Sequence, residues 1–189
     1  MDRIETERLI LRPFSRDDAE DVFDYAKDPR VGPIAGWQPH RDVEESREII
    51  RTILSLDGVA AMVLKDSGKV IGSVGFVNRH PVRELPDCPD NEIGYGLSPR
   101  FWGRGLVPEA VEAVLRWGFE NRSYRRIWCG HYAGNWRSAR VINKCGFRYQ
   151  FSKTEYVALM NEYRQCYDYV QTLEEWRSRT RDADAPCGL

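Results

Sequence analysis

Apolar and polar positions alternate along this chain with two different periodicities, that of an α-helix and that of a β-strand. They predict a series of short strands and helices. The run Leu9 to Leu11 predicts a first strand that ends at Pro13. Ser15 is a predicted helix N-cap, because Asp17 and Asp18 follow in the first turn, where acidic side chains favour the helix dipole. The buried face of this helix is expected to consist of Ala19, Val22, Phe23 and Ala26.

The same two periodicities continue to the end of the chain. They predict helices at residues 43–55, 107–121 and 136–145, a final helical turn at 174–179, and strands at 59–64, 70–77, 91–97, 126–132, 148–152 and 165–173. The segments 30–40 and 79–90 hold two and three prolines and are predicted loops. This order of elements predicts a mixed α/β sheet with helices on both sides.

Length and composition are those of one soluble globular domain. The chain has 189 residues, of which 42% are apolar and 30% charged, which is enough to build a single core. We expect the domain to span residues 1–179 and the polar segment 180–189 to be a flexible tail. The formal net charge of −1 gives no general attraction to nucleic acid.

Neither the start of the chain nor any internal stretch predicts export or membrane insertion. The opening MDRIETERLILRPF carries charge throughout and lacks the apolar stretch of a signal peptide. No window approaches the roughly 18 apolar residues of a membrane span. The five cysteines are widely spaced and form no CxxC pair, so we expect reduced thiols, no metal site and a cytoplasmic location.

The most informative segment is the glycine-containing turn between the predicted strand 91–97 and the helix 107–121. Gly103 and Gly105 allow successive backbone N–H groups to converge, and the helix N-terminus adds its own. Together they form an anion site suited to a pyrophosphate. The turn lacks the ending of a P-loop and follows the wrong strand for a dinucleotide-binding fingerprint. Taken alone, it is equally well a simple strand-to-helix connection.

At this turn the chain resembles the GNAT superfamily of acyltransferases. Residues 102–107, Trp-Gly-Arg-Gly-Leu-Val, stand where the family has its phosphate-binding Gln/Arg-x-x-Gly-x-Gly/Ala loop, although Trp102 and Val107 depart from that pattern. The register 100–105 matches letter for letter but leaves the following helix residues too far downstream. Segments 5–13, 92–95 and 135–147 are similar to the Rim-type N-terminal acetyltransferases of ribosomal proteins. The resemblance covers about residues 3–176.

The resemblance implies a fold, a co-substrate and a set of cofactor contacts. The fold is a single-domain, mostly antiparallel sheet of about seven strands with helices on both faces. It splays in the middle, where strand 92–97 leaves strand 126–132, so that the pantetheine arm of acetyl-coenzyme A inserts there. The implied cofactor-binding residues are Tyr95, Gly96, Leu97, Trp102, Gly103, Arg104, Gly105, Leu106, Val107, Pro108, Asn135 and Ser138.

Acetyl transfer needs an amine that is neutral when it attacks and a thiolate that is stabilised or protonated when it leaves. Glu92, on the strand before the loop, is the predicted base, and an ion pair with an arginine is its alternative. Ser138 is the candidate acid toward sulfur, Tyr132 is a weaker rival, and a surface hydroxyl is the alternative for Ser138. Asn135 is implied to bind pantetheine and is also a predicted N-cap.

Two positions bear on the acceptor. Rim-type enzymes tend to carry a glutamate shortly after the Gly-Phe pair, whereas this chain has Gln150 near that place, and glutamine cannot act as a base. Trp37 lies in a loop that usually lines the acceptor cleft of the family and is the predicted substrate contact. Covering the core is the more common fate of such a tryptophan.

The sequence therefore predicts an N-acetyltransferase that moves an acetyl group from acetyl-coenzyme A to a primary amine by direct attack. The acceptor is either a protein N-terminus or a small molecule, and the sequence leaves its identity open. The alternative is a coenzyme-A-binding sensor or interaction module without turnover. No nucleic-acid or membrane partner is expected, and the protein is expected to be a monomer or a homodimer.

Overall fold

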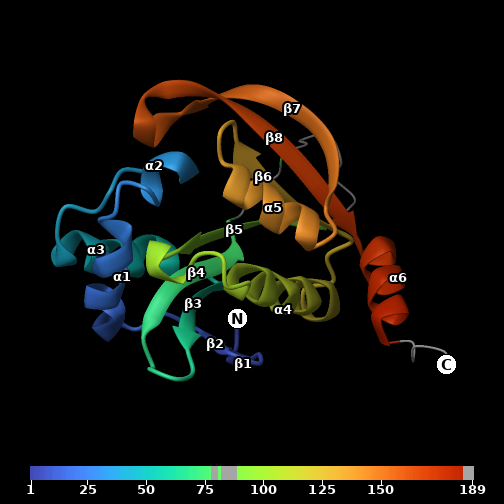
Figure 1. Ribbon diagram of the computed structural model, residues 1–189, viewed down its shortest axis with the longest axis horizontal. Helices are drawn as coiled ribbons and strands as arrows, with labels where there is room; N and C mark the ends of the chain where they lie inside the picture. The colour runs from blue at the N-terminus through green and yellow to red at the C-terminus, as the bar shows by residue number, and fades with distance from the viewer. Residues whose placement is uncertain (78–80, 82–88, 185–189) are drawn as a thin grey trace.

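The computed structural model describes residues 1–77, 81 and 89–184, and its strands form one open sheet (Figure 1). Within these residues the sheet has eight strands in the order β1-β2-β3-β4-β5-β6-β8-β7. They are β1 (Ile4–Glu5), β2 (Leu9–Arg12), β3 (Val59–Leu64), β4 (Val70–Phe76), β5 (Asp90–Leu97), β6 (Arg126–Tyr132), β7 (Arg148–Val157) and β8 (Glu162–Thr172). All neighbouring strands are antiparallel except β5 and β6. The predicted mostly antiparallel α/β sheet is confirmed, with the two-residue strand β1 as an addition.

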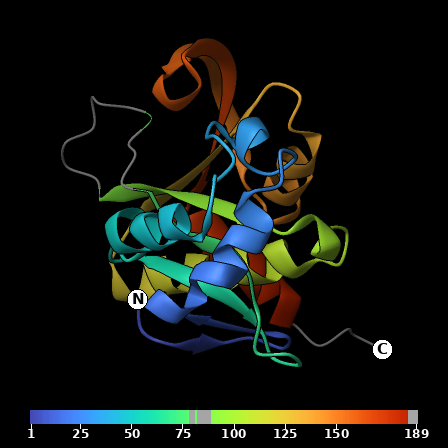
Figure 2. The same ribbon diagram turned by 90° about the vertical axis from the view of Figure 1, so that its left-hand side faces the viewer.

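Helices cover both faces of this sheet (Figures 1 and 2). They are α1 (Ala19–Ala26), α2 (Gly32–Ala35), α3 (Val43–Ile49) with a π-helical continuation (Ile50–Leu54), α4 (Leu106–Asn121), α5 (Trp136–Lys144) and α6 (Leu173–Asp184). Strand β2 shows why both faces are covered, because Leu9 and Leu11 pack in the cluster under α4, whereas Ile10 packs in the cluster under α1. Within the described residues no helix combines the length and the apolar character needed to cross a membrane.

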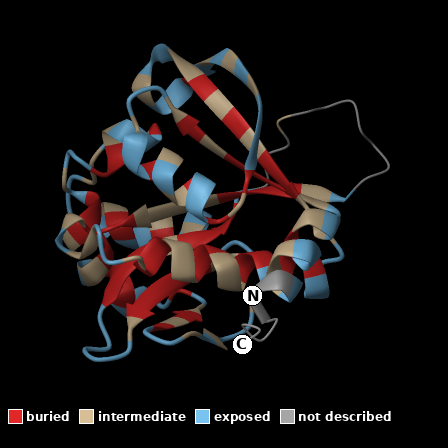
Figure 3. Ribbon diagram, turned by 45° about the vertical axis from the view of Figure 1, so that its right-hand side comes forward, coloured by how far each residue is buried: buried red, intermediate tan, exposed pale blue. Residues whose placement is uncertain are grey.

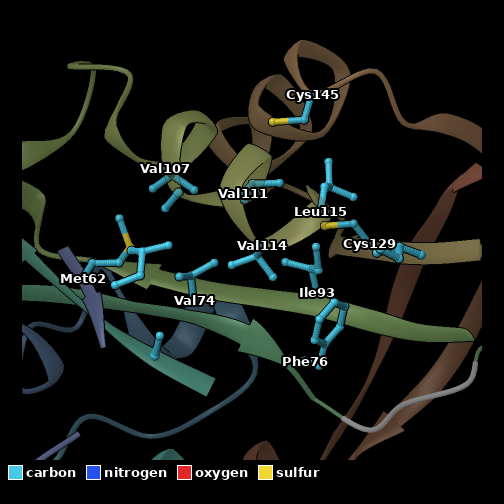
Figure 4. Packing of buried hydrophobic residues seen from close by; sticks show 14 of the residues in the cluster. Met62, Val74, Phe76, Ile93, Val107, Val111, Val114, Leu115, Cys129 and Cys145 are labelled. Carbon is cyan, nitrogen blue, oxygen red and sulfur yellow. The ribbon is translucent and has the colours of Figure 1, made fainter. Parts of the chain in front are cut away.

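The larger of the two cores lies between the central strands and α4 (Figures 3 and 4). Val107, Val111, Val114 and Leu115 recur at helical spacing along α4 and are buried against the sheet. Each such side chain contributes about 1.5–3 kcal/mol when it leaves water. Gly118 lets the helix approach closely, since an added Cβ there would lie 2.6 Å from Phe76 Cζ. This packing fixes the start of α4 relative to the end of β5.

Several predicted boundaries need correction. The loop at 30–40 contains the short helix α2, and β7 runs to Val157 rather than ending near residue 152. Helix α6 continues to Asp184, past the predicted end at Arg179. In α1, Tyr25 is buried and Phe23 only half-buried. Most of the loop predicted at 79–90 lies outside the described residues.

Strands β5 and β6 meet only at their beginnings and then separate. Their parallel pairing joins residues 90–92 to residues 126–128 and goes no further. Beyond that point β5 stays paired with β4 as far as Leu97, and β6 stays paired with β8 as far as Tyr132. The predicted splay is therefore confirmed. It divides the sheet into two halves, and the long β7–β8 hairpin extends from the second half toward α2 (Figure 1).

Candidate active site

A cleft of about 1210 Å³ opens beside the fork between β5 and β6. Its walls are the second half of β5, the glycine-containing loop, the starts of α4 and α5, the segment around α2 and the start of β8. Of the predicted cofactor-binding residues, those that line it are Tyr95, Gly96, Leu97, Trp102, Gly103, Gly105, Leu106, Val107, Pro108, Asn135 and Ser138. Arg104 is not among the lining residues and instead stacks on Phe101, with its guanidinium carbon 5.3 Å from the ring centroid.

The loop before α4 has the backbone conformation that its glycines allow. Gly103 and Gly105 have φ values of +75° and +77°, a region that side chains disfavour. Gly105 is the N-cap of α4 and has no side chain to cap the first turn. The N–H groups of Leu106 and Val107 belong to that first turn, which has no intrahelical acceptors, and both residues line the cleft. An anion in the cleft thus meets main-chain donors and the positive end of the helix dipole.

The start of α5 brings two polar side chains to the opposite wall, where they meet Tyr95 of β5. Asn135 Oδ1 accepts a hydrogen bond of 3.2 Å from the backbone N–H of Ser138, which confirms the predicted N-cap. Ser138 is buried, and its Oγ lies 2.8 Å from the hydroxyl oxygen of Tyr95. Burial raises the pKa of Tyr95 well above its ordinary value, so the phenol remains protonated near neutral pH. A neutral hydroxyl pair therefore lies at this point of the cleft.

The charged residues that line the cleft are all cations. They are Arg30, Arg137, Arg140, Lys144 and Arg164, and no Asp or Glu is among the lining residues of the described part of the chain. Three of them come from α5 at positions 137, 140 and 144, a spacing that places them along one side of the helix. This row was not predicted from the sequence, although the spacing inside the predicted helix 136–145 was a usable signal. A cleft with this charge favours a ligand with several negative charges.

Glu92 is buried at the fork itself rather than among the lining residues of the cleft. Its backbone pairs with Trp128 at the last point where β5 and β6 meet. An atom at the missing Cβ position of Gly130 would lie 3.3 Å from Glu92 Oε1 and 3.2 Å from Asp168 Oδ1. Asp168 is fully buried, and its Oδ2 lies 3.2 Å from Lys153 Nζ. Asp168 was not predicted as a site residue, because its neighbours on β8 form no catalytic pattern in the sequence.

The candidates for acceptor contacts occupy different surroundings. Trp37 is half-buried, packs against the α1 core and lies 5.5 Å from the His40 ring, so it does not line the cleft. Its role as a substrate contact stays a prediction. Gln150 is exposed at a register shift in β7. Glu155 on the same strand is half-buried and accepts a hydrogen bond of 3.0 Å from the Tyr132 hydroxyl, so the carboxylate on this strand lies five positions later than expected.

A sheet that forks beside a glycine-containing helix start, with a cation-lined cleft at the fork, is the architecture of an acyltransferase. Residues 8–148 match the family described as the acetyltransferase (GNAT) domain, and the chain belongs to this family. It is 32% identical over 155 residues to the uncharacterized N-acetyltransferase p20 of Bacillus licheniformis, which covers 78% of this chain and 83% of that protein.

Two further comparisons extend the likeness over most of the chain. A GNAT-family acetyltransferase from Bacillus anthracis superimposes with a TM-score of 0.79 at 25% identity, over 92% of this chain and 100% of that chain. The ribosomal protein uS5-alanine N-acetyltransferase of Escherichia coli (strain K12) is 24% identical over 185 residues, which cover 92% of each chain. The general predictions of fold and enzyme class are therefore confirmed.

Proposed function

We propose that this enzyme transfers an acetyl group from acetyl-coenzyme A to a primary amine. The observation that carries the proposal is the fork of β5 and β6, which opens into a cleft whose charged lining residues, in the described part of the chain, are all cations. Coenzyme A carries a pyrophosphate, a third phosphate and a narrow, amide-rich pantetheine arm. The cations and the loop amides suit the phosphates, and the unpaired edge of β5 suits the amides of the arm.

Different residues around the cleft then bind different parts of coenzyme A. Gly103, Gly105 and the first turn of α4 present main-chain N–H groups to the pyrophosphate. Beyond Glu92, where its pairing with β6 ends, β5 presents backbone N–H and C=O groups to the amides of the pantetheine arm. Asn135, at the start of α5, has an amide nitrogen for the pantetheine carbonyls while its oxygen caps the helix. The thioester is thereby directed to the fork, where Glu92 and Ser138 lie on nearby elements.

The chemical step is direct attack of the amine nitrogen on the thioester carbonyl carbon. The amine loses a proton, the C–S bond breaks, and the thiolate of coenzyme A is protonated or hydrogen-bonded as it leaves. We assign proton removal to Glu92, directly or through water. We assign stabilisation of the sulfur to the Ser138 hydroxyl, which Tyr95 supports across 2.8 Å. Much of the acceleration comes from holding the two reactants together.

The acceptor is proposed as a protein N-terminus or a small amine. A protein N-terminus is supported by the relative that acts on the alanine terminus of ribosomal protein uS5, and by the Rim-type segments of the sequence. A small amine is supported by Gln150, which departs from the Rim-type pattern. A coenzyme-A-binding module without turnover is the alternative.

One experiment separates these possibilities. The protein is mixed with acetyl-coenzyme A and either peptides with free N-termini, polyamines, amino acids or amine drugs, and release of the coenzyme A thiol is followed. Turnover with peptides alone assigns a protein acceptor, and turnover with small amines alone assigns a metabolite or drug. Calorimetric binding of acetyl-coenzyme A without thiol release on any acceptor would support the binding module instead.

A further inference from the structure

Trp102 joins three parts of the cleft wall. Its indole Nε1 donates a hydrogen bond of 2.9 Å to the carbonyl oxygen of Leu97, the last residue of β5. The guanidinium carbon of Arg137, on α5, lies 4.5 Å from the indole centroid, and that of Arg30 lies 5.9 Å from it. The sheet therefore holds the ring in place, and the ring carries one cation from α5 and one from the segment between α1 and α2.

The two arginines differ in how much of their charge is available to a ligand. Arg30 binds Asp28 in a bidentate pair, with Nε and Nη2 at 2.9 and 2.6 Å from the two carboxylate oxygens. This pair lowers the pKa of Asp28 to about 2, so the charge of Arg30 is matched at neutral pH. Arg137 is exposed, and within the described residues its side chain contacts the Trp102 ring without forming a hydrogen bond or an ion pair.

Arg137 also lies beside the part of the cleft that we assign to phosphates. It belongs to the first turn of α5, and Trp102 directly precedes Gly103 of the loop. The N–H groups of that loop are neutral donors, so a pyrophosphate held there lacks a counter-charge from the loop backbone itself. A guanidinium has the fork geometry and permanent charge that suit phosphate oxygens.

We propose that Trp102 is a positioning residue that holds the Arg137 guanidinium at the pyrophosphate of coenzyme A. The inference rests on the proposed use of coenzyme A. The indole face restricts a long, otherwise mobile side chain, so less rotamer freedom is lost when the phosphate binds. Trp102 thus acts through Arg137, and the affinity for the nucleotide end of coenzyme A depends on a pair of residues from opposite walls of the cleft.

The test measures binding of coenzyme A and dephospho-coenzyme A by calorimetry to the wild type, Trp102→Leu, Arg137→Gln and the double variant. Each single variant should raise Kd about tenfold. The double variant should lose no more affinity than the weaker-binding of the two single variants, because both changes remove the same interaction. Both ligands contain the pyrophosphate and only coenzyme A has the 3′-phosphate, so the loss should be equal for the two.

Two further variants separate positioning from a general effect on the fold. Arg122→Gln changes a cation that also stacks on an aromatic ring, that of Trp117 at 5.1 Å, but does not line the cleft, so its Kd should stay within about twofold of the wild type. Trp102→Phe keeps an aromatic face but lacks the hydrogen bond to Leu97. It should lose less affinity for coenzyme A than Trp102→Leu.

Three results would overturn the assignment. They are an unchanged Kd in Arg137→Gln, an additive loss in the double variant, and a loss seen with coenzyme A alone. The first keeps the test independent of the stability of Trp102→Leu, because Arg137 is exposed. A wild type that binds neither ligand would instead overturn the proposed function, and this inference with it.

Discussion

Tyr95 and Ser138 hold their hydroxyl oxygens 2.8 Å apart, although they are 43 residues apart in the chain and come from different walls of the cleft. The same phenol oxygen lies 3.3 Å from the backbone oxygen of Ser138, which is the alternative acceptor for its single proton. Because burial keeps the phenol protonated, Tyr95 can donate toward Ser138 Oγ while the serine proton faces the cleft. In the proposed function, this pair is the neutral donor for a sulfur that becomes negative as the thioester breaks.

Removing the serine hydroxyl should slow turnover more than it weakens binding. We expect Ser138→Ala to lower kcat about 10²-fold, the lower end of the range for lost acid catalysis. The KM for acetyl-coenzyme A should change by less than about threefold, because the hydroxyl acts on charge that develops only in the transition state. Tyr95→Phe should cost less, since the serine hydroxyl remains. Steady-state thiol release measures both, with the exposed Ser152→Ala as control. A larger loss in Tyr95→Phe would make Tyr95 itself the donor.

A second prediction tests the anion site. Gly105→Asp adds bulk and a negative charge at the N-cap of α4, where we place the pyrophosphate. Binding of coenzyme A should be abolished, as measured by calorimetry. Gly68→Asp is the matched control, because Gly68 also has a positive φ, +69°, and an added Cβ would meet nothing within 4 Å. Unchanged affinity in Gly105→Asp would mean that the pyrophosphate binds elsewhere.

The features that could be predicted well are those that depend on the local periodicity of apolar and polar residues. The strand 59–64 and the strand 126–132 have the predicted bounds. The first is a continuous apolar run, and a glycine-containing turn follows each of them. The fork could be predicted only through the family resemblance, since the pairing of β5 with β6 joins segments more than 30 residues apart. No local pattern records where two such strands stop pairing.

The missed features depend on tertiary contacts. One face of β7 carries the half-buried residues Phe151, Lys153 and Glu155 at alternate positions. Because two of the three are charged, the second half of the strand has no apolar periodicity in the sequence. The pairing of Arg137 with Trp102 and of Tyr95 with Ser138 joins residues from separate elements in the same way. Composition and spacing identify such residues individually, whereas their partners follow from the fold.

A third prediction concerns stability in alkali. Burial raises the pKa of Tyr25 to about 12, whereas an exposed tyrosine titrates near 10. Between these values the unfolded state releases the proton and the folded state keeps it, so the free energy of unfolding falls as pH rises. A shift of about two units corresponds to at most about 2–3 kcal/mol. Urea unfolding at about pH 9, 10 and 11 should show a flatter decline in Tyr25→Phe.

The comparison needs a matched variant that removes an exposed tyrosine instead of a buried one. Tyr163→Phe removes a tyrosine that is 74% exposed, and its decline should follow the wild type. Burial also raises the pKa of Tyr95, so part of the decline should persist in Tyr25→Phe. Equal slopes in the wild type and Tyr25→Phe would show that Tyr25 releases its proton alike in both states.

The last prediction concerns Glu92, which lies beside Gly130 at the fork. The missing side chain of Gly130 leaves a point about equally distant from Glu92 Oε1 and Asp168 Oδ1, at 3.3 and 3.2 Å, directly beyond the place where β5 and β6 part. Both carboxylates therefore lie beside the backbone of Gly130 at the fork, where the proposed function places the acceptor amine. Glu92→Gln should therefore lower turnover about 10²- to 10⁴-fold.

The pH profile separates base catalysis from a structural role for this carboxylate. Glu92→Gln should leave coenzyme A affinity nearly unchanged, because Glu92 does not line the cofactor cleft. Its loss of turnover should shrink as pH rises toward the pKa of the amine, near 8 to 10, where the acceptor deprotonates without help. A loss that is equal at every pH would indicate positioning instead of proton removal. Glu155→Gln is the comparison, and if it alone shows the pH-dependent loss, then the base is the carboxylate on β7.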